Sequence, residues 1–182
     1  MRILADIGRI TIILIALYVF FAAHKVLGMI IFGTALFSFI FKLRKGLFLE
    51  PSRRADGWEL FGVALVLANT LIIGFGNYND LRLSWLDIPM HLAGGAFAAW
   101  WAMLAFDEEK FAGLKNLIIP LGVAALLGVG WEFFEWIGDH TFLQWYTLPL
   151  AQLTLNDTMA DLLFDLLGGL AVFFLNWEKK MG

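Results

Sequence analysis

The chain has 182 residues, of which 60% are hydrophobic and 16% are charged, and it contains no cysteine. This composition excludes an ordinary soluble globular protein, and the missing thiols exclude disulfides, thiolate metal sites and cysteine nucleophiles. The net charge of −3 and the lack of a basic patch interleaved with aromatic residues argue against nucleic acid as a partner. At roughly 20 apolar residues per membrane span, the chain has room for about six spans.

Two apolar segments near the N-terminus are the first predicted spans. The first covers about Ile10–Ala23, with Ile3 as an alternative start, and the second covers Val26–Phe41. We expect two helices rather than one long kinked helix, because a lysine (Lys25) at the middle of a membrane would be costly. The basic and apolar N-terminus also resembles a secretory signal, but the second segment follows at once and favours a helical hairpin.

Further apolar segments complete the set. They run over about Trp58–Gly76, Trp85–Phe106, Leu117–Ile137 and Asn156–Trp177. A turn is expected over Asn77–Ser84, and short polar stretches separate the other segments. The sequence therefore predicts an all-α, polytopic membrane helix bundle of about six transmembrane helices, organised as a single integral membrane domain over residues 1–182.

Lysine and arginine residues are distributed unevenly between the two predicted membrane faces. A six-span arrangement leaves only Lys25 and Arg82 on one side. The other side receives Arg2, Arg9, Lys42, Arg44, Lys45, Arg53, Arg54, Lys110, Lys115, Lys179 and Lys180. Because loops rich in Lys and Arg stay in the cytoplasm, we expect both termini to be cytoplasmic.

Polar clusters at helical spacing interrupt the last three segments. They are Asp87-x-x-x-His91, Glu132-x-x-Glu135-x-x-x-Asp139 and Asp157-x-x-x-Asp161-x-x-x-Asp165. Residues three or four apart share one helix face, and the predicted topology places every cluster at the outer end of its span. Ionisable groups at membrane depth are rare unless they are paired, bind a ligand or have a function. We therefore expect a polar pocket, formed by residues 85–169, that opens outward.

A divalent cation would neutralise this acidic pocket. The candidate ligands are His91, Glu132, Glu135, Asp157, Asp161 and Asp165, with Asp87 and Asp139 in supporting roles. Carboxylate oxygens with one imidazole suit Mg²⁺, Mn²⁺, Ca²⁺ or iron, and Zn²⁺ also fits. The Glu-x-x-Glu spacing departs from the Glu-x-x-His pairs of di-iron bundles. The alternative is a metal-free network of protonated carboxyl groups that bond to one another or to the backbone.

Glycine pairs lie close to two of the clusters. Gly94-Gly95 follows His91, and Gly168-Gly169 follows Asp165. Small residues let helix backbones approach each other closely in membranes, so these pairs are expected to permit close helix packing.

The same motifs carry a family resemblance. An Asp-x-x-x-His-x-x-Gly-Gly motif starts at Asp87, a Trp-Glu-x-x-Glu motif starts at Trp131, and an Asn-Asp-Thr-x-x-Asp-x-x-x-Asp-x-x-Gly-Gly motif starts at Asn156. Together they resemble the YjdF-like family of small bacterial integral membrane proteins, which has no established reaction. The ground plan is also similar to VanZ-like proteins, but Asp165 and Glu135 stand where that pattern has asparagine and glutamine. The resemblance implies a multi-pass protein of the bacterial inner membrane.

Three function classes fit these observations. The first is a metal-assisted enzyme that hydrolyses or transfers the head group of a lipid-linked envelope substrate, with Glu135 or His91 as candidate catalytic base. The uncharged stretch Thr141–Leu155 would then be a re-entrant lid that admits membrane lipid. The second class is a cation or proton transporter, which the apolar sequence below the clusters disfavours. The third is a non-catalytic membrane protein whose polar network is structural. The sequence leaves the substrate and the oligomeric state open.

Overall fold

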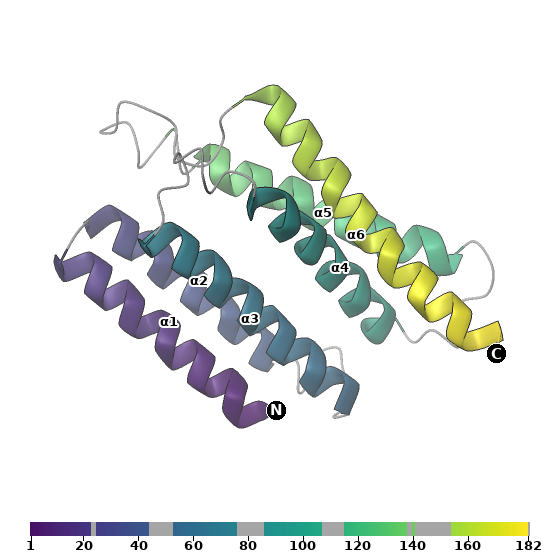
Figure 1. Cartoon of the computed structure of the whole chain (residues 1–182), viewed down its shortest axis with the longest axis horizontal. Coiled ribbons are helices and arrows are strands. Elements are labelled where there is room, and N and C mark those ends of the chain that lie inside the picture. Colours follow the sequence, from purple (N-terminus) through teal and green to yellow (C-terminus); the bar gives the residue numbers. More distant parts are fainter. Residues whose placement is uncertain are drawn as a thin grey trace. The chain divides into compact units, whose positions relative to one another are not determined.

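The computed structural model describes residues 1–22, 25–43, 53–75, 86–106, 115–137, 140 and 154–181. The elements in chain order are α1 (Arg2–Ala22), α2 (Lys25–Leu43), α3 (Arg53–Phe75), α4 (Asp87–Ala105), α5 (Lys115–Ile137) and α6 (Leu155–Met181) (Figure 1). The chain divides into two compact units, Met1–Leu83 with α1 to α3 and Ser84–Gly182 with α4 to α6. The all-α class is confirmed for the described residues, and the single-domain organisation stays a prediction.

The helices follow the predicted apolar segments but continue into polar sequence. The third helix begins at Arg53 rather than near Trp58, and the sixth ends at Met181 rather than at Trp177. Hydropathy marks the edge of the apolar layer, whereas a helix can continue through charged residues beyond that edge. The turn predicted over Asn77–Ser84 lies outside the described residues.

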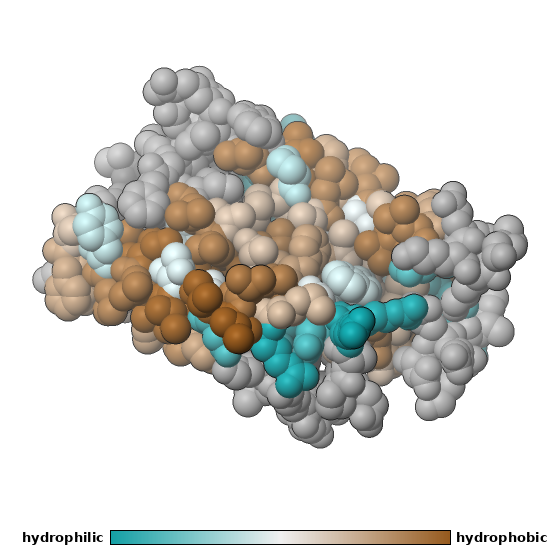
Figure 2. Space-filling view, turned by 60° about the horizontal axis from the view of Figure 1, so that its bottom comes forward, coloured by the Kyte–Doolittle hydropathy of each residue, from teal (hydrophilic) through white to brown (hydrophobic). Residues whose placement is uncertain are grey.

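Four of the helices have the length and composition of transmembrane segments. They are α1, α4, α5 and the Leu155–Asn176 part of α6. Between 22% and 33% of each apolar stretch is buried within the chain, so most of this apolar surface is available to lipid. Figure 2 shows hydrophobic residues over much of the visible described surface. That α2 and α3 also span the membrane stays a prediction.

The first two helices form a hairpin, as expected. Arg9 in α1 donates its Nε–H to the carbonyl oxygen of Ser38 in α2 at 3.3 Å, across 29 residues of sequence. One straight helix of that length would hold the two residues about 44 Å apart, at 1.5 Å per residue. α3 packs against α1, where a Cβ added to Gly8 would lie 2.6 Å from Cγ1 of Val63. The alternative of one long kinked helix is therefore wrong.

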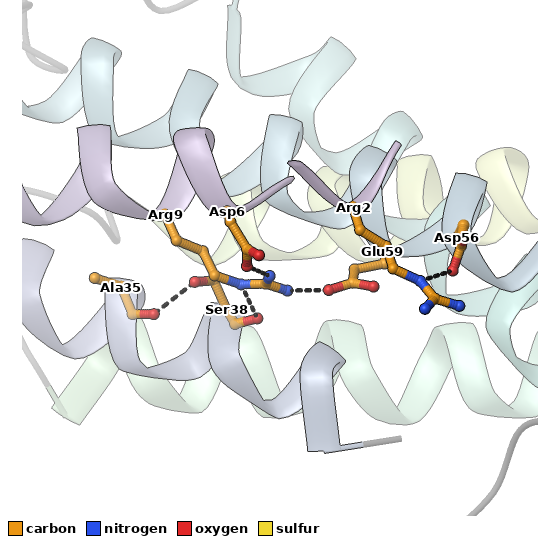
Figure 3. A network of polar contacts seen from close by, with 7 residues as sticks. All are labelled: Arg2, Asp6, Arg9, Ala35, Ser38, Asp56 and Glu59. Atoms are coloured by element: carbon orange, nitrogen blue, oxygen red, sulfur yellow. Dashed lines mark hydrogen bonds and ion pairs between the residues drawn. The ribbon is translucent and has the colours of Figure 1, made fainter. Parts of the chain in front are cut away.

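A buried ion-pair network joins the helices of the first unit at one end (Figure 3). Arg9 donates from Nη2 to Oε1 of Glu59 at 2.6 Å and from Nη1 to Oδ1 of Asp6 at 2.9 Å. Its guanidinium also lies 5.5 Å from the centre of the Phe39 ring. The side chains of Arg9 and Glu59 are 2% and 7% exposed. This network was not predicted, although opposite charges near the same end of two apolar segments were visible in the sequence.

Thr70 in α3 provides a test of packing in this unit. Its hydroxyl is buried, and no group in the described part of the chain hydrogen-bonds to it. A buried unsatisfied hydroxyl costs about 1–3 kcal/mol, so Thr70→Val should leave the melting temperature of the detergent-purified protein unchanged or raise it. Thr34, whose hydroxyl donates to the Ile31 carbonyl at 2.8 Å, is the matched control, and Thr34→Val should give no such gain. A lower melting temperature for Thr70→Val would contradict this assignment.

In the second unit α4 and α6 run parallel to each other and α5 runs antiparallel to both. Most of the buried hydrophobic residues of these helices are small, among them Ala98, Ala99, Ala102 and Ala124. A Cβ added to Gly95 of α4 would collide with the Asp165 backbone, and one added to Gly168 of α6 would collide with the Leu92 backbone. The predicted role of the glycine pairs in close packing is confirmed. This arrangement brings the starts of α4 and α6 to the end of α5, where the polar clusters lie.

Candidate metal centre

The row of aspartates on α6 begins in the first turn of the helix, at Asp157. Thr154 precedes the helix, and its hydroxyl oxygen accepts a hydrogen bond from the backbone N–H of Asp157 at 3.1 Å. A threonine in this position satisfies one of the backbone donors that the first turn leaves open. From this start Asp157, Asp161 and Asp165 follow at intervals of four residues on one side of α6.

A group of three side chains from α4 and α6 forms the centre of the site. Nε2 of His91 lies 3.7 Å from Oδ1 of Asp87 and 3.9 Å from Oδ1 of Asp161. One potential ligand atom from each of these residues lies within 4.8 Å of the other two. His91 and Asp161 are buried, and Asp87 is half-buried. The predicted meeting of the α4 and α6 clusters is therefore present, and Asp87, expected in a supporting role, is one of its central members.

Asp165 approaches His91 from the other side of the imidazole ring. Its Oδ2 lies 3.4 Å from Nδ1 of His91, and the residue is buried. The carboxylate is enclosed by glycines: a Cβ added to Gly94 would lie 3.6 Å from Oδ1, and one added to Gly128 of α5 would collide with Oδ2. Glycine at position 128 was not singled out from the sequence, because only the helix register shows that Asp165 faces it.

α5 contributes two glutamates to the surroundings of this group. Glu132 is buried, and its charge acts on both Asp161 and Glu135. Glu135 accepts a hydrogen bond from the indole N–H of Trp131 at 2.8 Å. This i,i+4 contact within one helix holds the Glu135 carboxyl group beside the Trp131 indole, and Glu135 interacts electrostatically with His91 and Asp87.

The remaining predicted site residues lie farther from the centre. Asp157 is half-buried and acts electrostatically on Asp87 and Asp161, but it does not belong to the close group of three. Asp139 and residues 141–153, which include most of the predicted lid, lie outside the described residues. The described polar residues of the 85–169 region thus lie toward one end of α4, α5 and α6. That they line a pocket stays a prediction.

The geometry of the central group suits a metal ion. Metal–ligand bonds of about 2.0–2.6 Å place the ligand atoms of one ion about 3–5 Å apart. The separations of 3.7 Å and 3.9 Å from Nε2 of His91 fall in this range. Two carboxylates and one imidazole are ligands that Mn²⁺, iron and Zn²⁺ accept, and oxygen-rich surroundings also suit Mg²⁺ and Ca²⁺. Among these grouped side chains the carboxyl groups outnumber the imidazole, so a bound cation would reduce their mutual repulsion.

Comparison with known proteins identifies the family of the chain. No curated protein and no solved structure shows a significant match. A family model described as "Predicted membrane protein (DUF2238)" matches residues 7–180, which include the described parts of α4, α5 and α6 that carry the site. Together with the apolar helices, this match shows that the chain is a membrane protein and belongs to the DUF2238 family.

Proposed function

We propose that this protein binds a divalent cation between α4 and α6 and uses it at the outer face of a bacterial inner membrane. The observation that supports the proposal most directly is the close approach of ligand atoms from Asp87, His91 and Asp161, residues that lie on two different helices. Two carboxylates and an imidazole at the end of apolar helices are costly to maintain without a partner ion or a function.

The orientation in this proposal comes from the distribution of basic residues. With six spans, the loops rich in Lys and Arg face the cytoplasm together with both termini. The starts of α4 and α6 and the end of α5 then face outward. The resemblance of the motifs to YjdF-like and VanZ-like proteins agrees with a location in the bacterial envelope.

A lipid-linked head group is the substrate class that we assign to this site. A cation held between α4 and α6 would polarise an ester or phosphoryl oxygen, or lower the pKa of a bound water. Glu135 would be the general base, because it interacts electrostatically with His91 and Asp87 of the cation site and the Trp131 indole fixes its carboxyl group. Substrate would reach the site laterally from the membrane.

A structural role for the polar network is the second candidate, and one observation favours it. Both ring nitrogens of His91 have carboxyl oxygens nearby, with Asp165 at 3.4 Å and Asp87 at 3.7 Å. Such a network can satisfy itself without metal. A transporter is less well supported, because the buried residues of α4 beyond the cluster include Ala98, Ala99 and Ala102, which offer no ligands to a moving ion.

Elemental analysis of the detergent-purified protein tests the proposal. We expect about one equivalent of a divalent metal in the wild type after purification without chelators and resupply of candidate ions. His91→Ala removes a ligand, and Asp161→Asn replaces a charged carboxylate oxygen by a neutral amide oxygen, which binds a divalent cation more weakly. Each should weaken metal binding by at least about tenfold. Inner-membrane lipids incubated with the loaded protein should release a head group, and Glu135→Gln should stop the release while it keeps the metal.

Asp157→Asn is the matched control for the metal measurement. It removes a carboxylate from the same helix, one turn from Asp161, without removing a member of the group of three, so the metal content should stay near that of the wild type. Melting temperatures show whether each variant is folded. A wild type that binds no candidate ion would disprove the cation site and leave the structural network as the better explanation.

A further inference from the structure

His91 is the residue on which the cation site depends, and its ring must present one particular nitrogen. Nε2 faces Asp87 and Asp161, while Nδ1 faces Asp165. A neutral imidazole carries its proton on only one nitrogen, and the other nitrogen has the free lone pair that a metal needs. Something must therefore place the proton on Nδ1 if Nε2 is to bind the cation.

Asp165 is placed to fix this choice. Oδ2 of Asp165 lies within hydrogen-bond distance of Nδ1, at 3.4 Å. A carboxylate in its ionised form only accepts hydrogen bonds, so this contact favours the tautomer with the proton on Nδ1. Carboxylates that accept a hydrogen bond from a metal-binding histidine recur in metalloproteins, where they fix the tautomer and the orientation of the ring.

The packing around Asp165 holds its carboxyl group in this position. The backbone of Asp165 is pressed against Gly95, and its carboxyl group occupies space next to Gly94 and Gly128. At Gly128 an added Cβ would meet the carboxyl oxygen Oδ2 and lie 3.1 Å from Cγ. The atoms in the way belong to a side chain rather than to backbone, so alanine at 128 would move the carboxyl group without separating the helices.

We propose that Asp165 is a positioning residue, which holds the proton of His91 on Nδ1 so that Nε2 faces the cation, and that Gly128 provides the space for its carboxylate. The role of Nε2 as a ligand rests on the proposed cation site. The orientation of His91 by Asp165 does not, and it can be observed in the metal-free protein.

Nitrogen NMR of protein labelled with ¹⁵N-histidine tests this proposal without an activity assay. The chain has 3 histidines, and His91→Ala identifies the signals of His91. The spectra are recorded at a pH at which the imidazole is neutral, because a cationic ring carries protons on both nitrogens. In the wild type we expect the proton on a hydrogen-bonded Nδ1 and an unprotonated Nε2 before addition of Zn²⁺, and a change at Nε2 with Nδ1 still protonated when Zn²⁺ binds. Gly128→Ala should weaken the Nδ1 hydrogen bond and lower the Zn²⁺ affinity about 10–100-fold, the usual effect of losing such a partner.

Gly130→Ala is the control, because an added Cβ there meets no atom within 4 Å, and it should keep the wild-type spectrum and affinity. Asp165→Ala, a second variant, should also lose the NMR signal of the hydrogen-bonded Nδ1 proton. Zn²⁺ on Nδ1, or an unprotonated Nδ1 in the wild type, would overturn the positioning role. So would Gly128→Ala with wild-type spectrum and affinity. A third outcome separates the two proposals. If the wild type shows the hydrogen-bonded Nδ1 proton, Gly128→Ala lacks it, and the wild type binds no Zn²⁺, the positioning role is supported and only the cation site is refuted.

Discussion

Gly168→Ala and Gly95→Ala are expected to prevent stable packing of α4 against α6. A Cβ at Gly168 would collide with the carbonyl oxygen of Leu92 and lie 2.9 Å from the nitrogen of Ala96. A Cβ at Gly95 would collide with the carbonyl oxygen of Asp165 and lie 2.6 Å from its Cα. All these atoms are backbone, so no side-chain rotation can relieve the overlap and the two helices must separate.

The expected loss of stability is about 3 kcal/mol or more for each variant, at the upper end of the cost of overpacking. Separation would also move Asp161 and Asp165 away from His91, so the proposed metal binding should disappear together with the fold. Size-exclusion profiles and melting curves of the detergent-purified variants provide the measurement.

Two glycines of α5 serve as controls for these substitutions. An added Cβ at Gly122 or Gly130 meets nothing within 4 Å. Alanine is the better helix former by about 1 kcal/mol, so Gly122→Ala and Gly130→Ala should be as stable as the wild type or slightly more so. If Gly168→Ala were as stable as Gly130→Ala, the close approach of α4 and α6 would be disproved.

Arg9→Met is expected to destabilise the first unit by about 3–5 kcal/mol, because it removes the positive charge that is paired with the buried Glu59 carboxylate. Glu59 is almost as buried as Arg9, and their contact is 2.6 Å long. The double variant Arg9→Met/Glu59→Leu removes both buried charges and should regain a large part of the lost stability. Asp6 remains in that variant, but its side chain is 45% exposed and water can solvate it.

A double-mutant cycle measured by thermal unfolding in detergent gives the coupling free energy between Arg9 and Glu59. Arg2→Met is the control: the Arg2–Asp56 pair is 3.0 Å long but has side chains that are 49% and 19% exposed. Exposed pairs contribute about 0–1 kcal/mol, so Arg2→Met should change little. If the two single substitutions at Arg9 and Glu59 were additive in the double variant, the buried pair would not be what holds these helices.

Hydropathy and helical spacing were sufficient to predict much of this architecture. The apolar segments predicted the helices to within a few residues at most ends, and the spacing of Asp87 and His91 and of Asp161 and Asp165 placed each pair on one helix face. The predicted topology then placed the starts of α4 and α6 at the same membrane face. These are properties of single helices and of chain direction, which a sequence expresses directly.

Relations between helices were harder to predict. Which ring nitrogen of His91 faces Asp165 depends on how α4 is rotated against α6, and the role of Gly128 depends on the register of α5. The Arg9–Glu59 pair likewise depends on the depth at which α1 and α3 meet. In a membrane, an apolar helix face can pack against lipid or against several other helices with similar energy. The periodicity of the sequence therefore does not determine how one helix is rotated or shifted along its axis relative to the next.

The buried pair of Arg9 and Glu59 has a consequence for how the protein is made. Glu59 is synthesised 50 residues after Arg9, which takes roughly 3–10 s at about 5–20 residues per second. During that interval Arg9 has Asp6, three residues earlier, as its acidic neighbour. We therefore expect α1 to reach its final packing only after α3 has been synthesised, because Glu59 completes the surroundings of Arg9.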